Sequence, residues 1–115
     1  MEYSISEKND AVIFSFKGNI MGGPTATGFR EEIKSLVDDG KTNIIGDFSA
    51  VDFMNSSGLG ILIATLTSLR KEGGDFKICS PTDRIKSLLK ISKLFTVFDI
   101  YQTQEEAVKA YQEKK

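Results

Sequence analysis

Residues 47–60 read DFSAVDFMNSSGLG, and the fold predicted for the chain is organised around this stretch. The short apolar run over residues 43–48 is typical of a buried strand, which we expect to end at Asp47. A loop should follow and lead to Asn55 or Ser56. Both residue types are strong N-caps, because a side-chain oxygen accepts a hydrogen bond from a free N–H of the first helical turn. The stretch therefore predicts a strand, a loop and the start of a helix.

Strands and helices alternate along the rest of the chain. The expected elements are a hairpin from Tyr3 to Phe16 around Lys8-Asn9-Asp10, a loop over residues 18–23, helices from Thr25 to Gly40 and from Ser56 to Glu72, a strand from Asp75 to Cys79, a helix from Asp83 to about Ser92, a short strand near Val97 to Tyr101, and a helix from Gln104 to Tyr111. This order indicates an α/β fold. We predict a single domain over residues 1–115, with a mixed, mostly parallel sheet of four to five strands, an N-terminal hairpin and about four flanking helices.

The composition excludes most enzyme classes. The chain contains no histidine, which removes the usual general base and the commonest transition-metal ligand. Its single cysteine, Cys79, cannot form an internal disulfide, and four Cys or His ligands for a structural zinc site are lacking. We expect a protein that is not an enzyme and that has no cofactor and no metal site, with Cys79 buried as a small apolar side chain.

The nearly equal numbers of basic and acidic residues argue against nucleic acid and membranes as partners. Fifteen basic and 16 acidic residues give a formal net charge of −1, so no overall basic character attracts a polyanion. The apolar run from Leu59 to Ala64 is too short to span a bilayer, and the N-terminus has no basic segment followed by an apolar run. We therefore expect a cytoplasmic protein.

The helix start near Ser56 is a suitable place for a phosphate. Free N–H groups and the positive end of the helix dipole favour an anion there. We expect Gly58 and Gly60 to let the backbone approach its neighbours closely. No basic residue occurs between Lys41 and Arg70, so a phosphate on Ser56 would add negative charge to an acidic and apolar surface. Such a change would be sensed by a bound partner.

The predicted second helix has one apolar residue outside its expected buried face. That face consists of Leu59, Leu62, Ile63, Leu66 and Leu69. Ile61 falls on the other side, where it predicts an exposed docking patch beside Ser56. An alternative is that a neighbouring loop covers Ile61.

The central motif closely resembles the signature of bacterial anti-sigma factor antagonists, which are STAS domain proteins. The resemblance rests on residues 47–60, on Gly18-Asn19-Ile20, on Gly73-Gly74 before a strand, and on residues 85–95 followed by Phe98. It covers essentially the whole chain. Two features differ from many members of the family: Asn55 stands where an aspartate is common, and residues 19–23 are neutral where an acidic residue is common.

The resemblance implies a partner-switching mechanism. The unphosphorylated protein would bind an anti-sigma factor that is also a serine kinase, and a sigma factor would be released. Phosphorylation of Ser56, or alternatively Ser57, would end this binding, and a serine phosphatase would restore it. The partner-binding residues that we expect are Asn19, Met21, Asn55, Ser56, Ser57, Gly58, Leu59 and Ile61.

Two alternatives remain beside this interpretation. The chain could be a STAS scaffold or ligand-binding module that is never phosphorylated and regulates a different partner. A phosphoaspartate receiver with Asp47 as the acceptor is disfavoured, because Glu7 and Asp10 are poorly placed to hold Mg²⁺.

The basic residues Arg84, Lys86, Lys90 and Lys93 indicate a solvated helix face or a surface for an acidic partner.

Overall fold

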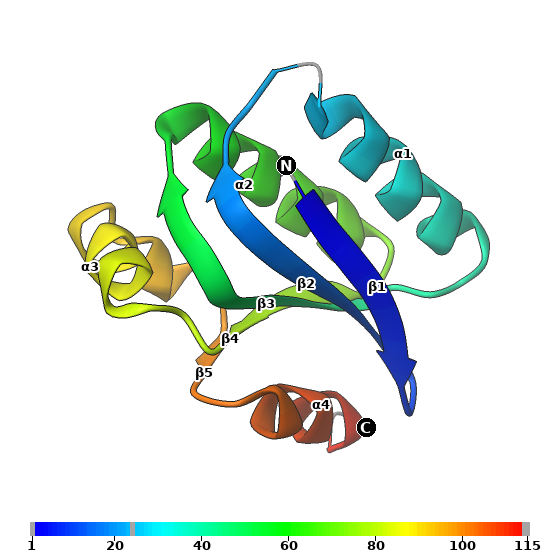
Figure 1. Cartoon of the computed structure of the whole chain (residues 1–115). Coiled ribbons are helices and arrows are strands. Elements are labelled where there is room, and N and C mark those ends of the chain that lie inside the picture. The colour runs from blue at the N-terminus through cyan, green and yellow to red at the C-terminus, as the bar shows by residue number, and fades with distance from the viewer. Residues whose placement is uncertain (1, 24, 114–115) are drawn as a thin grey trace.

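A five-stranded sheet forms the centre of the molecule (Figure 1). The computed structural model describes residues 2–23 and 25–113, so Pro24, which precedes the expected helix start at Thr25, lies outside the described residues. The elements in chain order are β1 (Glu2–Lys8), β2 (Ala11–Ile20), α1 (Thr25–Asp38), β3 (Asn43–Met54), α2 (Ser56–Lys71), β4 (Asp75–Cys79), α3 (Asp83–Ile91), the 3₁₀ helix η1 (Leu94–Thr96), β5 (Ile100–Tyr101) and α4 (Gln104–Gln112).

The strand order in the sheet is the order along the chain, from β1 to β5. β1 pairs with β2 antiparallel through a two-residue turn, in which Asn9 adopts a left-handed conformation with φ of 55°. All other neighbouring strands are parallel. The predicted fold class is confirmed: a mixed, mostly parallel sheet with an N-terminal hairpin and four α-helices.

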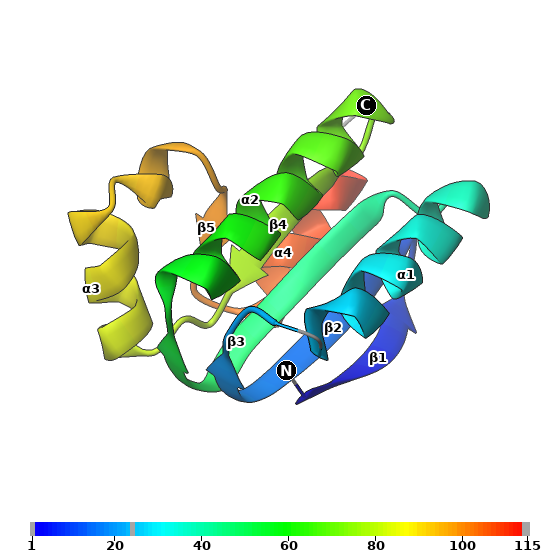
Figure 2. The same ribbon diagram turned by 90° about the horizontal axis from the view of Figure 1, so that it is seen from above.

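Helices cover both faces of the sheet (Figures 1 and 2). α1 and α2 lie on one face and α4 on the opposite face, while α3 lies at the side of the sheet near β3. Side chains of β2 alternate between the two cores, because successive residues of a strand point to opposite faces. Phe14 packs in the core with α1, α2 and α3, whereas Ile13 packs in the smaller core under α4. Cys79 is buried in that smaller core, as predicted.

β2 and β3 are longer than the sequence indicated, and this corrects two predictions. We expected β3 to end at Asp47 and residues 18–23 to form a loop, but β3 reaches Met54 and β2 reaches Ile20. Two irregularities in the pairing, between Ser15 and Lys17 and between Gly18 and Asn19, each place one extra residue on β3. Such bulges break the alternation of apolar and polar residues by which a strand is recognised.

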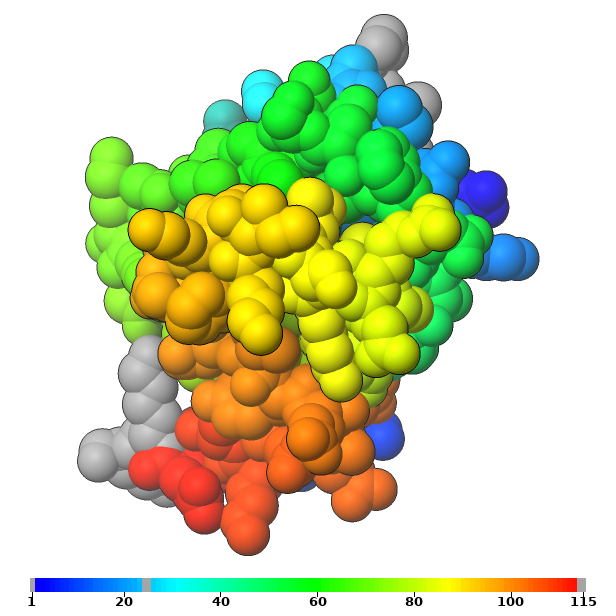
Figure 3. Space-filling model, turned by 90° about the vertical axis from the view of Figure 1, so that its left-hand side faces the viewer, coloured from blue at the N-terminus to red at the C-terminus, as the bar shows by residue number. Residues whose placement is uncertain are grey.

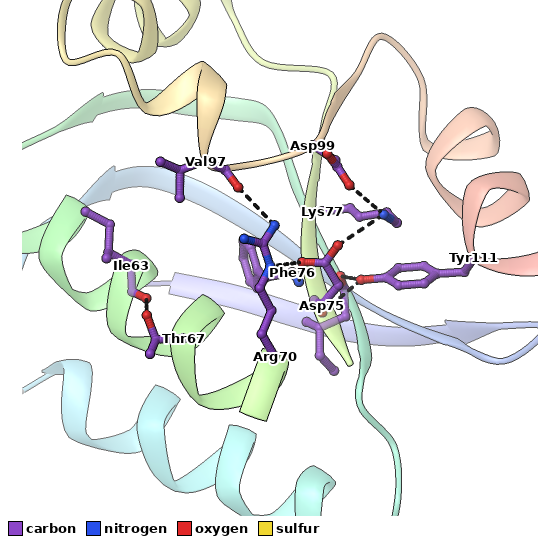
Figure 4. A network of polar contacts seen from close by, with 10 residues as sticks. Ile63, Thr67, Arg70, Asp75, Phe76, Lys77, Val97, Asp99 and Tyr111 are labelled. Atoms are coloured by element: carbon purple, nitrogen blue, oxygen red, sulfur yellow. Dashed lines mark hydrogen bonds and ion pairs between the residues drawn. The ribbon is translucent and has the colours of Figure 1, made fainter. Parts of the chain in front are cut away.

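A buried ion-pair network joins the helices to β4 (Figure 4). Lys77 Nζ lies 3.2 Å from Asp75 Oδ2 and 3.0 Å from Asp99 Oδ2, while Arg70 Nε donates to Asp75 Oδ1 at 3.1 Å. Arg70 also donates to the Val97 carbonyl at 2.9 Å. The Tyr111 hydroxyl donates to the carbonyls of Ile44 and Asp75, at 2.6 and 2.8 Å. The network therefore holds α2 and the segment before β5 against β4, and it holds α4 against both β3 and β4.

The charged groups of this network are stabilised in the folded protein. Burial alone would raise the pKa of Asp75, but hydrogen bonds from the Phe76 N–H, Lys77 and Arg70 outweigh it and hold the pKa below its ordinary value. For Lys77, burial alone would lower the pKa, but the hydrogen bonds and ion pairs with Asp99 and Asp75 outweigh burial and raise the pKa above its ordinary value. Asp75 and Lys77, whose pKa values are shifted in this way, lie on β4 and therefore outside the stretch around Ser56.

The segment before α4 contains less strand than expected. The strand predicted near Val97 to Tyr101 is reduced to β5, because residues 97–99 form a turn and a bend after η1. α4 begins with a complete capping box, in which Thr103 and Glu106 each accept from the other's backbone N–H.

Within the described residues, no helix has the length and apolar character that crossing a membrane requires.

Candidate functional site

The stretch around Ser56 lies where β2 and β3 end side by side (Figure 1). Ile20 pairs with Met54 in the last register position of the two strands, and α2 begins two residues later. The backbone N–H of Asn55 donates to the Ile20 carbonyl at 3.3 Å. Functional sites in parallel sheets often lie beyond the carboxyl ends of neighbouring strands.

Asn55 is the N-cap of α2, one of the two residues predicted for this role. Its side-chain Oδ1 accepts a hydrogen bond of 2.7 Å from the Gly58 N–H, and its carbonyl accepts one of 2.9 Å from the Leu59 N–H. The N–H groups of Ser56 and Ser57 have no acceptor among the residues that the structure describes. The first turn therefore offers two free donors at the positive end of a 16-residue helix.

The two serines differ in their surroundings, although both are exposed. A Cβ on Gly22 would lie 2.5 Å from the Cβ of Ser57, so the loop before α1 crosses directly over this serine. Ser56 is the first residue of the helix. Gly22 therefore approaches the side chain of Ser57 closely, at the second position of the helix.

Gly58 is required by the approach of β2 to the helix, as predicted. A Cβ at Gly58 would come closer than 3.0 Å to the carbonyl oxygen of Ile20, a distance that real Cβ atoms essentially never show. The expectation for Gly60 is wrong, because nothing lies within 4 Å of the position of its Cβ. Gly58 therefore fixes how α2 sits on the sheet, and Gly60 does not.

Ile61 does not form an exposed docking patch. Its side chain is only 5% exposed and belongs to the main core, so the predicted exposed patch is wrong. Because the bare Gly58 faces β2, the residues three and four positions further on, Ile61 and Leu62, turn inward with it. Leu59 and Ile63, which we placed on the buried face, are only partly buried.

Two other apolar side chains are exposed at this end of the sheet. Met21, in the loop after β2, is 40% exposed, and Phe53, near the end of β3, is 43% exposed. Phe53 is the register partner of Asn19, which is also exposed, while the next pair, Ile20 and Met54, points into the core. Sequence reasoning missed Phe53, because exposing it depends on the bulges in β3.

The segments that form the site carry no positive charge. Residues 18–29 and 42–69, which provide both strand ends, the loop and α2 up to its last turn, include no Lys or Arg. Asp52 is exposed on β3, and Asp47 accepts hydrogen bonds from the Ser49 N–H and the Gln104 side chain. Among the described residues, no three metal-ligating side chains gather into a group that could hold an ion. The site offers an exposed hydroxyl, free N–H donors and apolar surface.

Comparison with known proteins places this arrangement in a family. The family model of the STAS domain matches residues 2–107. The chain belongs to the STAS domain family. A similar protein is BtrV of Bordetella bronchiseptica, which carries the provisional name of an anti-sigma factor antagonist. The two are 21% identical over 105 residues, which cover 91% of this chain and 90% of BtrV.

Solved STAS structures share this fold. The crystal structure of an anti-sigma factor antagonist from Mycobacterium paratuberculosis superposes with a TM-score of 0.82 at 28% identity, covering 97% of this chain and 94% of that one. The Bacillus cell fate determinant SpoIIAA, solved in its phosphorylated form, superposes with a TM-score of 0.74 at 21% identity, covering 96% and 99%. The predicted membership of the STAS family is confirmed.

Proposed function

We propose that this STAS protein is an anti-sigma factor antagonist that is switched off by phosphorylation of Ser56. In the unphosphorylated form it binds an anti-sigma factor that is also a serine kinase, and this binding releases a sigma factor. A serine phosphatase restores the binding form. The observation that carries the proposal is the exposed Ser56, the first residue of α2, next to free N–H groups and within segments that contain no basic residue.

The helix start allows the phosphate without loss of the fold. A phosphoserine carries about −1.5 to −2 charges at neutral pH. The dipole of α2 and the free N–H groups of Ser56 and Ser57 favour an anion here by about 0.3–1 kcal/mol. The phosphorylated protein should therefore remain folded.

The same phosphate should prevent docking. Met21 and Phe53 supply exposed apolar side chains near Ser56, and a partner that packs on them would have to remove water from a dianion. No Lys or Arg in residues 18–29 or 42–69 is available to compensate the charge. Binding should thus depend on the phosphorylation state, whereas folding should not.

Relatives support this interpretation. Proteins of this fold include named anti-sigma factor antagonists, and SpoIIAA of Bacillus exists in a phosphorylated form. The crowding of Ser57 by Gly22 favours Ser56 over Ser57 as the residue that a kinase reaches. A constitutive scaffold of the same fold would not need an exposed hydroxyl at this position.

The test compares binding by three variants produced in the native cells. Tagged Ser56→Ala should co-purify as much anti-sigma factor as the unphosphorylated protein does. With Ser56→Asp, the amount of anti-sigma factor recovered should fall by about tenfold or more. Ser68→Asp is the matched control, since Ser68 is exposed on the same helix, roughly 18 Å further along its axis. Equal recovery with Ser56→Ala and Ser56→Asp would contradict the switch and favour the scaffold.

A further inference from the structure

The segment over residues 84–97 is the most strongly basic part of the chain. It contains Arg84, Lys86, Lys90 and Lys93 and no acidic residue, so it carries +4 in a chain whose net charge is −1. All four basic side chains are exposed. None of them forms an ion pair with another described residue. Positive charge is thus concentrated on α3 and on the turn that follows it.

Exposed apolar side chains accompany these charges. Ile91 is 81% exposed, Phe95 52% and Val97 36%, which makes three of the six large exposed apolar residues of the described chain. The turn that presents Phe95 passes through Lys93, which adopts a left-handed conformation with φ of 62°. Figure 3 views the molecule from this side, where the yellow and light-orange atoms of α3 and η1 protrude between α2 and β5.

A pocket of about 260 Å³ opens between α3 and η1. Phe95, Leu89 and Ile100 form its walls together with Lys86 and Lys90, whose long aliphatic stems can line an apolar cavity while their ammonium groups remain in water. A pocket of this kind accepts one large apolar side chain as an anchor, with charged groups at its rim.

We propose that the surface around this pocket, with Lys86, Lys90 and Phe95 at its walls and Lys93 in the adjoining turn, binds an acidic segment of a partner protein; we call it the α3 surface. One apolar side chain of that segment enters the pocket beside Phe95. Its carboxylates face the lysine rim, where complementary charges speed association and select the partner. This interaction goes beyond the proposed function, because it does not involve Ser56.

A second copy of this chain fits the α3 surface poorly. In a symmetric dimer the same patch meets itself, so the lysines of one copy would lie against those of the other. A bilayer also fits poorly. Helices that lie in a membrane interface insert a continuous apolar face, but the apolar face of α3, with Ile85 and Leu89, is already buried in the protein core. A concave pocket beside exposed lysines matches an acidic protein segment better.

α3 is attached to the strand that leads to Ser56, so the two surfaces must be tested separately. Thr82 caps α3 through a bond from the Ile85 N–H, and its hydroxyl donates to the Val51 carbonyl of β3 at 3.3 Å. A partner on the α3 surface could therefore lie close to a partner at Ser56. The proposal requires that binding at the α3 surface persists when Ser56 carries a negative charge.

The experiment is site-specific photo-crosslinking in the native cells. Benzoylphenylalanine is introduced at Phe95 and, as a control, at the exposed Glu105 of α4, and the crosslinked peptides are sequenced by mass spectrometry. We expect crosslinks from position 95, but not from 105, to a segment rich in Asp and Glu around a large apolar residue. The double variant Lys90→Glu/Lys93→Glu should reduce them on the order of tenfold, whereas Lys90→Arg/Lys93→Arg should retain them.

Each other outcome overturns the proposal. Crosslinks only to lipid would indicate a membrane surface, and crosslinks only to this chain would indicate self-association. Crosslinks that are unaffected by charge reversal, or no crosslinks above those of position 105, would exclude an acidic partner. Crosslinks that disappear in Ser56→Asp would make the α3 surface part of the Ser56 interface. The proposed function is tested independently, because Ser56→Ala and Ser56→Asp are compared with the α3 surface intact.

Discussion

The carbonyl oxygen of Ile20 lies in the space that a side chain on Gly58 would occupy. The same carbonyl accepts a hydrogen bond from the Asn55 N–H, and the Asn55 side chain accepts one from the Gly58 N–H. The end of β2 is therefore connected to the residues on both sides of Ser56 and Ser57. This connection fixes where the helix starts relative to β2, and with it the position of the proposed phosphorylation site at Ser56.

Gly58→Ala should disturb this contact and destabilise the protein. Its Cβ can be accommodated only if α2 or β2 moves, which should lower the free energy of unfolding by about 2–3 kcal/mol. Gly60→Ala is the matched control on the same helix. It meets open space and should stabilise α2 by up to about 1 kcal/mol. Urea unfolding measures both, and equal effects would contradict the close packing of Gly58.

Asn55→Ala should weaken the start of α2. The Gly58 N–H would lose its acceptor, at a cost of about 1 kcal/mol in the free energy of unfolding. Asn55→Asp should keep the cap and the stability, since a carboxylate oxygen accepts the same hydrogen bond and favours the helix dipole. Thermal unfolding compares the two variants. A loss of stability in Asn55→Asp as large as in Asn55→Ala would show that Asn55 has a role other than capping.

Local signals explain how much of the fold could be predicted. Caps, turn residues and helical periodicity depend on neighbours in the sequence, and the hairpin around Asn9, the Asn55 cap and the extents of α1 and α2 followed from them. The continuation of β3 to Met54 could not be foreseen, since polar Ser49 and Asp52 interrupt its apolar pattern and only pairing with β2 extends it.

The candidate site was predictable in its motif but not in its surface. Ser56, Asn55 and Gly58 are adjacent in sequence, and their local arrangement followed from capping. The exposure of apolar side chains did not follow. Ile61 is buried because contact of Gly58 with Ile20 sets the rotation of α2, and Phe53 is exposed because bulges set its direction. Both depend on contacts between β2 and residues more than 30 positions later.

The Asp75–Lys77 ion pair should give stability that changes with pH. Because the pKa of Asp75 is lowered in the folded state, its contribution is present above the ordinary Asp value of 3.8 and is lost as the pH falls through the lowered pKa. Because the pKa of Lys77 is raised, its contribution is present below 10.5 and is lost as the pH rises through the raised pKa. The free energy of unfolding should therefore be highest at intermediate pH and fall at both ends. Urea unfolding between pH 2 and 11 measures this dependence.

Asp75→Asn separates this ion pair from the other titrating groups. Removal of the charge beside the buried Lys77 should lower the free energy of unfolding at pH 7 by about 3 kcal/mol. The variant should also lose less stability than the unmodified protein between pH 5 and pH 2. Glu7→Gln removes the exposed ion pair with Lys41 and should leave the stability at pH 7 nearly unchanged. An identical acid profile for Asp75→Asn would contradict the account.

Phe53→Asp should weaken partner binding without unfolding the protein. Phe53 is 43% exposed and lies at the strand end beside Asn19, so an aspartate there remains in water. An apolar anchor at an interface contributes about 2 kcal/mol or more when it is central, which corresponds to a loss of roughly 30-fold in affinity. Co-purification of the anti-sigma factor measures the loss. Ile5→Asp, on the exposed β1, is the control that should bind normally.

The central claim is that Ser56 carries a phosphate that changes with the state of the cell. Phosphopeptide mass spectrometry of the protein from its native cells, grown under several growth and stress conditions, measures this directly. The account predicts phosphate on Ser56, with an occupancy that differs between conditions, and none on Ser57. Ser56 that stays unmodified in every condition while a partner still co-purifies, or phosphate on Ser57 instead, would contradict it.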